Sequence, residues 1–350
     1  MAYSSIIKPS TLMNTVLYTG DGGTKNITGV GFQPDWIWIK SRSNTKNNAL
    51  FDAVRGVTKR LSSNSDTLEA TVSTSVTAFG SDGFSLGSDT TQNASGNTFV
   101  AWNWKAGTSV SGNTSGSGTA KAYSGSVNTT SGFSIIKYVG NGTAGHTIPH
   151  HLGVAPKTVI CKSMSENRGW PIQHASLTSA AYSIFLSTQG SQSNGSNSWN
   201  STAASSSVVT LADNASNNKD GDSYIMYSFA PKQGYSKFGT YEGNSNTNGT
   251  FVYLGFKPAW LMVKPIDATD NWVMFDNKRL GFNSSTSPFN FAGANNTNAE
   301  TTDTGQLDLL SNGFKIRNSG GTVNKSSTYI YLAFAEEPFV ASNFNAATAR

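Results

Sequence analysis

The sequence predicts an all-β protein built from three tandem homologous β-sandwich units of a jelly-roll-like kind. Short apolar and aromatic runs alternate with period two, and Gly, Ser, Thr and Asn fill the stretches between them. Helical periodicity is scarce, so crossover helices are not expected. One pattern of residues and spacings also occurs three times, which is typical of internal duplication.

The repeated pattern consists of a tyrosine, a proline and an apolar strand that ends in lysine. The tyrosine stands 16, 18 and 17 residues before the proline in the successive copies, and the lysine stands six residues after it. An aromatic strand closes each copy, at residues 99–104, 224–229 and 329–334. We therefore divide the chain into a first unit (1–107), a second unit preceded by a linker (108–233) and a third unit with a C-terminal tail (234–350).

The strand at residues 36–40 alternates between two faces. Its residues Trp36, Trp38 and Lys40 share one face, and apolar residues occupy the other face in all three copies. The apolar residues are Ile37 and Ile39, Val159 and Cys161, and Leu261 and Val263. We expect this second face to be the core side. Because proline cannot donate a ladder hydrogen bond, the proline before each strand favours a strand entrance and argues against a central position.

Tight turns indicate antiparallel pairing. Asp82-Gly83 and Asn312-Gly313 each precede a short strand, at residues 84–86 and 314–316, and are typical of hairpins. Residues 106–128 are rich in Gly, Ser and Thr, which predicts a flexible linker between the first and second units. The tail at residues 340–350 has little apolar surface to bury.

Composition narrows the class of protein. An aromatic content of 11% excludes a disordered chain, and the single cysteine, Cys161, excludes an internal disulfide. No apolar run reaches membrane-spanning length and the first residues lack signal-peptide features, so we expect a soluble chain made in a cytoplasm, without membrane insertion. The net charge is +5, but Lys and Arg are scattered singly, so nucleic acid is not an expected partner.

No pattern of catalytic residues emerges. Residues 83–87 match a nucleophile-elbow motif, yet the third copy has Lys315 in place of the serine and no helix follows. The paired carboxylates of glycoside hydrolysis do not recur among the units. We therefore expect no catalytic residues, no cofactor and a non-enzymatic protein.

The candidate metal ligands are a group of histidines and a group of aspartates. His146, His150 and His151 crowd one loop, but the corresponding loops of the other units contain no histidine, so we expect no metal site. An Asn-rich loop with Asp213, Asp220 and Asp222 leaves calcium binding open.

The candidate ligand or partner contacts are four tryptophans and two lysines at matched strand positions. Indole faces stack on sugar rings and on partner surfaces. These residues are Trp36, Trp38, Trp260, Trp272, Lys40 and Lys264. Two alternatives stay open: the tryptophans fill a second core layer or the contacts among the units, and the lysines are solvated edge charges that discourage strand pairing.

Residues 18–20, 29–40, 99–107 and 234–239 resemble those of a domain family of uncharacterised function. The family is found in virion structural proteins of marine tailed bacteriophages and is labelled tail-fibre-like; the resemblance runs from about residue 9 to residue 339. It implies a non-enzymatic component on the outside of the virion, present in multiple copies, with other tail or capsid proteins as partners.

We therefore expect a phage virion surface protein, foremost a tail-fibre-like receptor-binding adhesin whose loops and aromatics contact host surface glycan. The alternative is a capsid decoration (cement) protein that binds the major capsid protein. Three equivalent units suit a threefold position of a shell, and the chain lacks the heptads of a fibre shaft. A polysaccharide-degrading enzyme is the third interpretation, and homo-oligomer formation is left open.

Overall fold

The structure is a computed structural model that describes residues 8–195, 197–279, 283, 288–304 and 306–338. Nearly all of its regular elements are antiparallel β-strands; the helical elements among the described residues are η1 (Pro9–Thr11) and α1 (Thr90–Asn93). The predicted fold class, all-β and sandwich-like, is confirmed. In the described part of the chain, no helix combines the length and apolarity needed to cross a membrane.

The first unit holds a main sheet and a smaller one. The main sheet has the order β1 (Met13–Thr19), β9 (Thr98–Trp104), β3 (Trp36–Ser41) and β4 (Ala49–Asp52). The smaller sheet has the order β2 (Lys25–Ile27), β8 (Gly83–Leu86) and β7 (Val76–Gly80). A two-stranded ribbon joins β5 (Lys59–Arg60) and β6 (Ala70–Thr71).

The second unit has a longer main sheet. Its order is β10 (Thr108–Asn113), β12 (Ala122–Asn128), β13 (Phe133–Val139), β19 (Ser223–Phe229), β15 (Thr158–Ser163), β16 (Pro171–His174) and β17 (Ile184–Phe185). The smaller sheet has the order β11 (Ser115–Gly116), β14 (His146–Pro149) and β18 (Val208–Leu211).

The third unit follows the same plan. Its main sheet has the order β20 (Ser236–Glu242), β28 (Thr328–Pro338), β22 (Phe256–Pro265), β23 (Val273–Asp276), β24 (Pro288–Gly293) and β25 (Thr301–Thr304). The smaller sheet has the order β21 (Phe251–Tyr253), β27 (Gly313–Ile316) and β26 (Leu307–Leu310).

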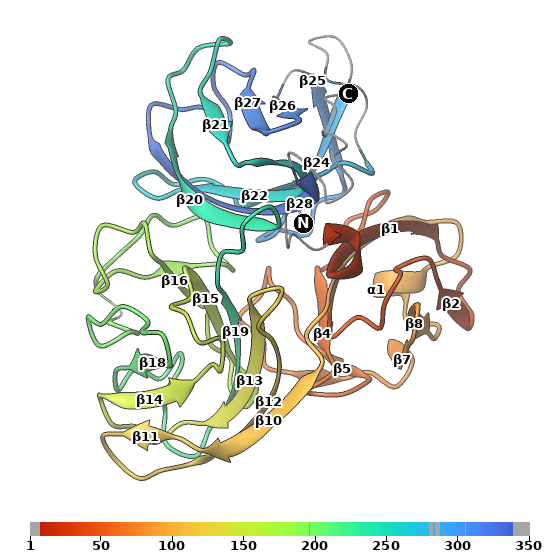
Figure 1. The fold of residues 1–350 in the computed structure, drawn as a ribbon. Coiled ribbons are helices and arrows are strands. Elements are labelled where there is room, and N and C mark those ends of the chain that lie inside the picture. The colour runs from red at the N-terminus through yellow and green to blue at the C-terminus, as the bar shows by residue number, and fades with distance from the viewer. Residues whose placement is uncertain (1–7, 196, 280–282, 284–287, 305, 339–350) are drawn as a thin grey trace, which may run out of the picture.

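One strand order recurs in the three main sheets. It runs β1-β9-β3-β4, β13-β19-β15-β16 and β20-β28-β22-β23. The smaller sheets likewise pair β2 with β8, β14 with β18 and β21 with β27. Figure 1 shows the three groups of strands around a common centre, with the first in red to orange, the second in yellow to green and the third in green to blue. The unit boundaries at 107/108 and 233/234 stay a prediction.

Each unit has a hydrophobic core of its own, and a further core lies where the three units meet. The predicted core faces are confirmed, because Ile37 and Ile39 lie in the first unit's core and the equivalent pairs lie in the other two. The opposite face of β3 is buried as well, since Trp36 and Trp38 lie in the shared core. Both faces of the lysine-ended strands are therefore interior.

The predicted linker at residues 106–128 is wrong, because most of this stretch is paired. β10 and β12 form a hairpin on the edge of the second main sheet, and β11 joins the smaller sheet. Tyr123, Val127 and Val110 pack on the core of the second unit and anchor the hairpin. The residues on the other face of the hairpin are small and polar, so the alternation of apolar and polar residues is difficult to recognise in the sequence. The tail at residues 340–350 lies outside the described residues.

The expectation that proline keeps its strand away from the sheet centre is also wrong. β3, β15 and β22 each lie between two neighbouring strands. Pro258 lies within β22, where the pairing with β28 shifts register on both sides of it. An irregularity of this kind accommodates a residue that cannot donate a ladder hydrogen bond.

Candidate functional site

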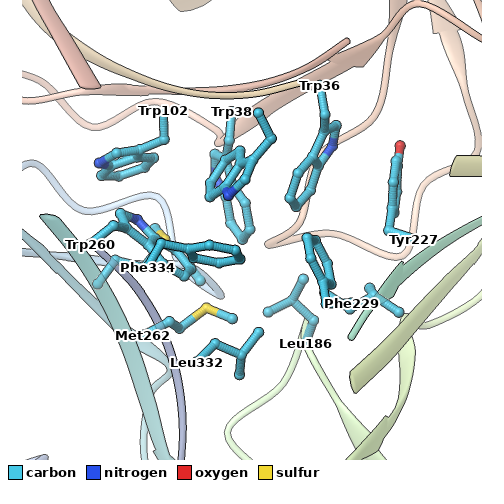
Figure 2. Close-up of a cluster of buried hydrophobic side chains, with 14 of the residues drawn as sticks. Trp36, Trp38, Trp102, Leu186, Tyr227, Phe229, Trp260, Met262, Leu332 and Phe334 are labelled. Carbon is cyan, nitrogen blue, oxygen red and sulfur yellow. The ribbon is translucent and has the colours of Figure 1, made fainter. Parts of the chain in front are cut away.

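The four predicted tryptophans lie in the interior of the molecule. Trp36, Trp38, Trp260 and Trp272 are each at most 2% exposed. Figure 2 shows the first three beside Tyr227 and other large side chains from all three units, facing one another where the main sheets meet. None of the four offers a surface to an external ligand, so the expected contact role is wrong for the folded chain.

Aromatic contacts link the units directly. The Trp36 ring of the first unit lies 4.7 Å from the Tyr227 ring of the second, measured between centroids. Trp104 of the first unit lies 5.3 Å from Trp260 and 5.7 Å from Phe334 of the third. Such pairs stabilise an interface beyond the area that they bury. Trp36 and Trp260 therefore lie in contacts among the units, which is one of the two alternatives that the sequence left open.

The matched lysines are buried too, and each Nζ donates to backbone carbonyls. Lys40 donates to the carbonyl of Thr297 in the third unit, at 3.0 Å, and Lys162 donates to that of Asp66 in the first unit, at 2.9 Å. Lys264 donates to the carbonyl of Pro265 in its own unit, at 2.8 Å. Burial lowers the pKa of each lysine to about 8. Lys40 and Lys264 are therefore neither ligand contacts nor solvated edge charges.

Eight residues after each lysine, a side-chain N–H reaches a carbonyl of another unit. Trp170 of the second unit donates to Ser62 of the first, at 3.1 Å. Trp272 of the third unit donates to Phe185 of the second, at 3.0 Å, and Asn48 of the first donates to Gly293 of the third, at 3.1 Å. These equivalent contacts run from each unit to a different neighbour, so they close a ring.

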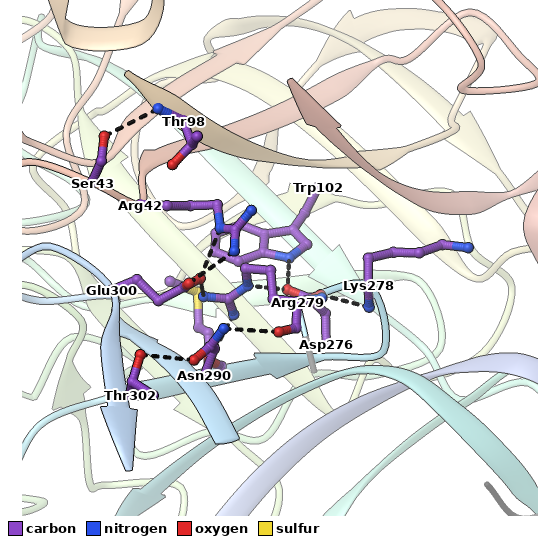
Figure 3. A network of polar contacts seen from close by, with 11 residues as sticks. Arg42, Ser43, Thr98, Trp102, Asp276, Lys278, Arg279, Asn290, Glu300 and Thr302 are labelled. Atoms are coloured by element: carbon purple, nitrogen blue, oxygen red, sulfur yellow. Dashed lines mark hydrogen bonds and ion pairs between the residues drawn. The ribbon is translucent and has the colours of Figure 1, made fainter. Parts of the chain in front are cut away.

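A second set of equivalent contacts involves the residue that ends β4 and β23. Asp276 of the third unit accepts a hydrogen bond from the indole of Trp102 in the first, at 3.0 Å (Figure 3). Asp52 of the first unit accepts one from the hydroxyl of Tyr227 in the second, at 2.7 Å. Trp102 and Tyr227 hold the same position in β9 and β19, two residues before the strand ends. The two contacts are therefore equivalent.

Each of these aspartates also anchors a buried ion-pair chain. Asp276 pairs with Arg279 at 2.5 Å, and Arg279 pairs with Glu300 at 3.0 Å. The same three residue types recur in the first unit, where Arg55 bridges Asp52 and Glu69. Glu300 further pairs with Arg42 of the first unit, at 3.0 Å, as Figure 3 shows. These charges compensate one another inside the protein.

The second unit replaces the whole ion-pair chain with neutral residues. His174 and Leu177 stand where the first unit has Asp52 and Arg55. Gln192 stands where the first unit has Glu69, because the backbone N–H groups of Gln192, Glu69 and Glu300 donate to the equivalent carbonyls of Ile266, Met164 and Arg42. On the facing strand β28, Leu332 stands where the other units have Trp102 and Tyr227, so no donor is present. Burial lowers the pKa of His174 to about 4, against an opposing effect of the Tyr331 backbone. The interface between the second and third units therefore lacks both the hydrogen-bond donor, at Leu332, and the ion-pair chain, at His174.

The other histidines have structural partners. His146 binds the side chains of Asn218 at 2.8 Å and Thr114 at 2.7 Å, and His151 binds the hydroxyl of Tyr123 at 2.9 Å. Within the described ranges, no group of three or more His, Cys, Asp or Glu side chains is arranged to hold a metal ion.

The calcium alternative concerned the aspartates of the Asn-rich loop. Asp220 pairs with Lys121 at 2.8 Å, and Asp222 lies 3.7 Å from Lys219. These two carboxylates therefore have cationic side chains as neighbours in place of a shared metal ligand set.

In the described part of the chain, the large aromatic side chains that are exposed lie on β21 of the third unit. Phe251 is 44% exposed and Tyr253 is 57% exposed, whereas Val252 between them is buried. Lys237 lies 5.5 Å from the centre of the Tyr253 ring and donates to the Tyr253 carbonyl at 2.6 Å. Lys315 stands opposite Phe251 in the β21–β27 pair. We call Phe251, Tyr253, Lys237 and Lys315 the aromatic surface.

The aromatic surface provides the chemistry that we first assigned to the tryptophans. Exposed rings stack on sugars or on apolar side chains of a partner, and the two ammonium groups favour an acidic neighbour. Sequence reasoning missed it because an aromatic, valine, aromatic run equally fits a buried strand. A comparison of the units could have identified it. Ile27 of the first unit is equivalent to Val252, and its neighbours Asn26 and Thr28 are polar, whereas the neighbours of Val252 are aromatic.

The comparisons with known proteins give one match. A family model described as a domain of unknown function (DUF7483) matches residues 8–338, which is nearly the whole chain. Neither a curated protein nor a solved structure matches.

Proposed function

The chain belongs to the DUF7483 family, and we propose that it is a non-enzymatic structural protein of a phage virion surface, acting as a tail-fibre-like adhesin. The resemblance of its repeated segments to tail-fibre-like virion proteins supports the virion assignment. The observation that carries the adhesin role is the aromatic surface, where two partly exposed rings project from a strand whose middle residue, Val252, is held in a core. Host surface glycan is the proposed ligand.

The rigidity of the frame supports a role in attachment. Preformed binding surfaces lose less conformational entropy on association than flexible ones. The rings of Phe251 and Tyr253 stand on a strand that is paired with β27 and packed on the third unit's core. Several copies on one particle would add avidity to a weak single contact.

Adsorption to cells tests the adhesin role. The purified chain is expected to bind cells of the bacterium that the particle infects and to slow infection when added in excess. Removal of surface glycan from the cells should abolish both effects. Equal binding to host and non-host cells at all protein concentrations would count against the proposal.

A second candidate function, capsid decoration, is favoured by the ring of equivalent contacts that Asn48, Trp170 and Trp272 make. Three similar units closed around one core present a threefold-like face that suits a threefold position of a shell. The partner would be the major capsid protein, through a patch of roughly 800 Å² or more on each side. Copy number in purified particles separates the two functions: a few copies in multiples of three or six support the adhesin, and dozens to hundreds support decoration.

A polysaccharide-degrading activity is not proposed. Among the buried carboxylates of the described residues, Asp35 accepts the backbone N–H of Ala106 and Asp308 pairs with Arg317. Asp52 and Asp276 are bound to arginines and to donors of neighbouring units. They serve the contacts among the units. Release of oligosaccharide from host polysaccharide by the purified chain would overturn the non-enzymatic assignment.

A further inference from the structure

The β10–β12 hairpin departs from the strand order that the units share. It extends only the main sheet of the second unit, whereas β1 and β20 form the corresponding edges of the other two. Between the hairpin and the first unit lies an open cleft of about 520 Å³. Ala53 and Val54, directly after β4 (Figure 1), line the cleft together with residues of β10 and β12. The hairpin that forms one wall of the cleft has no counterpart in the strand orders of the other two main sheets.

One wall of the cleft is a row of serine hydroxyls. Ser109 pairs with Ser126 and Ser111 pairs with Ser124, so the four side chains lie on one face of the hairpin. Val110, which alternates with them, packs on the core of the second unit and leaves the serines on the cleft side. The Ser126 hydroxyl accepts a hydrogen bond from the backbone N–H of Gly107, at 2.7 Å. The other three serines are exposed.

The opposite wall carries a carboxylate that the fold does not require. Asp35 is 5% exposed, and one of its oxygens accepts the N–H of Ala106 at 2.8 Å. Burial raises its pKa. Lys157 and Ala259 hold the position of Asp35 in the other two units. The backbone carbonyl of each of the three residues accepts the N–H of the residue that directly follows β4, β16 or β23. An aspartate is therefore a special feature of the unit that faces the cleft.

We infer that this cleft is a binding site for a neutral oligosaccharide. Serine hydroxyls, the Gln33 amide and the Asp35 carboxylate supply donors and acceptors that match sugar hydroxyls, which both donate and accept. Ala53 and Val54 supply apolar contact for the C–H face of a ring. No lining residue is basic, which disfavours an anion, and a single carboxylate is a poor ligand set for a divalent cation.

The size of the cleft suits such a ligand. Its volume lies within the range of about 300 to 1,000 Å³ that small-molecule sites occupy. The biological identity of the ligand as host glycan rests on the proposed adhesin role, but binding of a saccharide is measurable without it. The site is separate from the aromatic surface, which lies on the third unit.

Saturation-transfer NMR on the full chain tests the inference, with maltotriose, cellotriose and tri-N-acetylchitotriose as neutral probes and trigalacturonate as the acidic one. At least one neutral probe is expected to bind saturably with a Kd on the order of 1 mM, and the acidic probe more weakly. Ser111→Trp fills the cleft from an exposed strand position and should weaken binding about tenfold or more. Asp35→Asn, which keeps an acceptor for Ala106, should weaken it several-fold.

The matched control is Ser115→Trp, an exposed strand position of β11 that does not line the cleft. It should bind the neutral probe as the unchanged chain does. The inference is overturned if no neutral probe saturates, if trigalacturonate binds as tightly, or if Ser111→Trp binds normally. Those outcomes would leave adsorption to host cells intact, whereas saccharide binding without adsorption would instead contradict the adhesin role.

Discussion

The indole of Trp102 donates its N–H to the carboxylate of Asp276 across the interface between the first and third units, at 3.0 Å. The equivalent contact between Tyr227 and Asp52 joins the second unit to the first. Both hydrogen bonds end on a carboxylate that is fully buried and paired with an arginine. Equivalent residues thus hold different pairs of units together, and the three units are parts of one block.

Replacing Trp102 with phenylalanine should destabilise the chain more than the same change at Trp104. Both substitutions remove part of a buried ring, but Trp104 has no hydrogen-bond partner for its indole nitrogen. Trp102→Phe also removes a hydrogen bond to a buried charge, which costs about 1.5–3 kcal/mol more. Urea unfolding measures both variants. Equal losses would show that the bond to Asp276 contributes nothing.

Introducing a carboxylate at the neutral interface should be costly. His174→Asp places an acid where Leu177 offers no cation and Leu332 no donor, so we expect a loss of about 3–5 kcal/mol in the free energy of unfolding. The triple variant His174→Asp, Leu177→Arg, Gln192→Glu rebuilds the chain of charges found in the first unit and should recover part of that loss. A triple variant less stable than the single one would contradict the equivalence of the three interfaces.

Stability should fall as the pH is lowered below about 6.5. Burial lowers the pKa of His174 to about 4, so its folded-state pKa lies below the ordinary value. The unfolded chain therefore binds a proton first, and stability is lost between pH 6.5 and pH 4, by roughly 2 kcal/mol down to pH 5. His146 and His150, whose pKa values burial also lowers, act in the same sense.

The variant His174→Gln isolates the contribution of that residue. Its urea midpoint should depend less on pH between 7 and 5 than that of the unchanged chain. An identical pH dependence would assign the effect to other groups.

Removing the aromatic surface should impair attachment without harming the fold. Phe251→Ser and Tyr253→Ala change partly exposed side chains, so we expect stability to change by about 0.5 kcal/mol or less. Adsorption to host cells should decrease strongly. Leu17→Ser, at a residue of the first unit that is 40% exposed, is the matched control and should adsorb normally. Normal adsorption of both β21 variants would show that the aromatic surface does not contact the host cell.

Much of the strand framework could be predicted from the sequence. The alternation of Ile37 and Ile39 with tryptophans identified a strand and its core face, because local periodicity reports which residues share a face. The role of the other face could not be predicted. Apolar residues on a strand look the same whether they meet a ligand, a partner or another unit, and only the tertiary arrangement places Trp36 against Tyr227.

The cleft was equally hidden from local reasoning. Ser109 and Ser111 give no apolar signal, so the sequence predicts a linker at their strand. Their pairing with Ser126 and Ser124 depends on the register across the hairpin. The backbone hydrogen bonds show that Lys157 and Ala259 occupy the position of Asp35 in the other units, so an aspartate at this position is particular to the first unit. Comparison of the three units reveals which residues the fold does not require.

Differential scanning calorimetry of the full chain most directly tests whether the three units form one interlocked block. A single transition is expected, with equal calorimetric and van't Hoff enthalpies, because the shared core and the buried contacts among units break together. Trp102→Phe should lower the temperature of that whole transition. Three separate transitions, with Trp102→Phe displacing only one of them, would contradict the account.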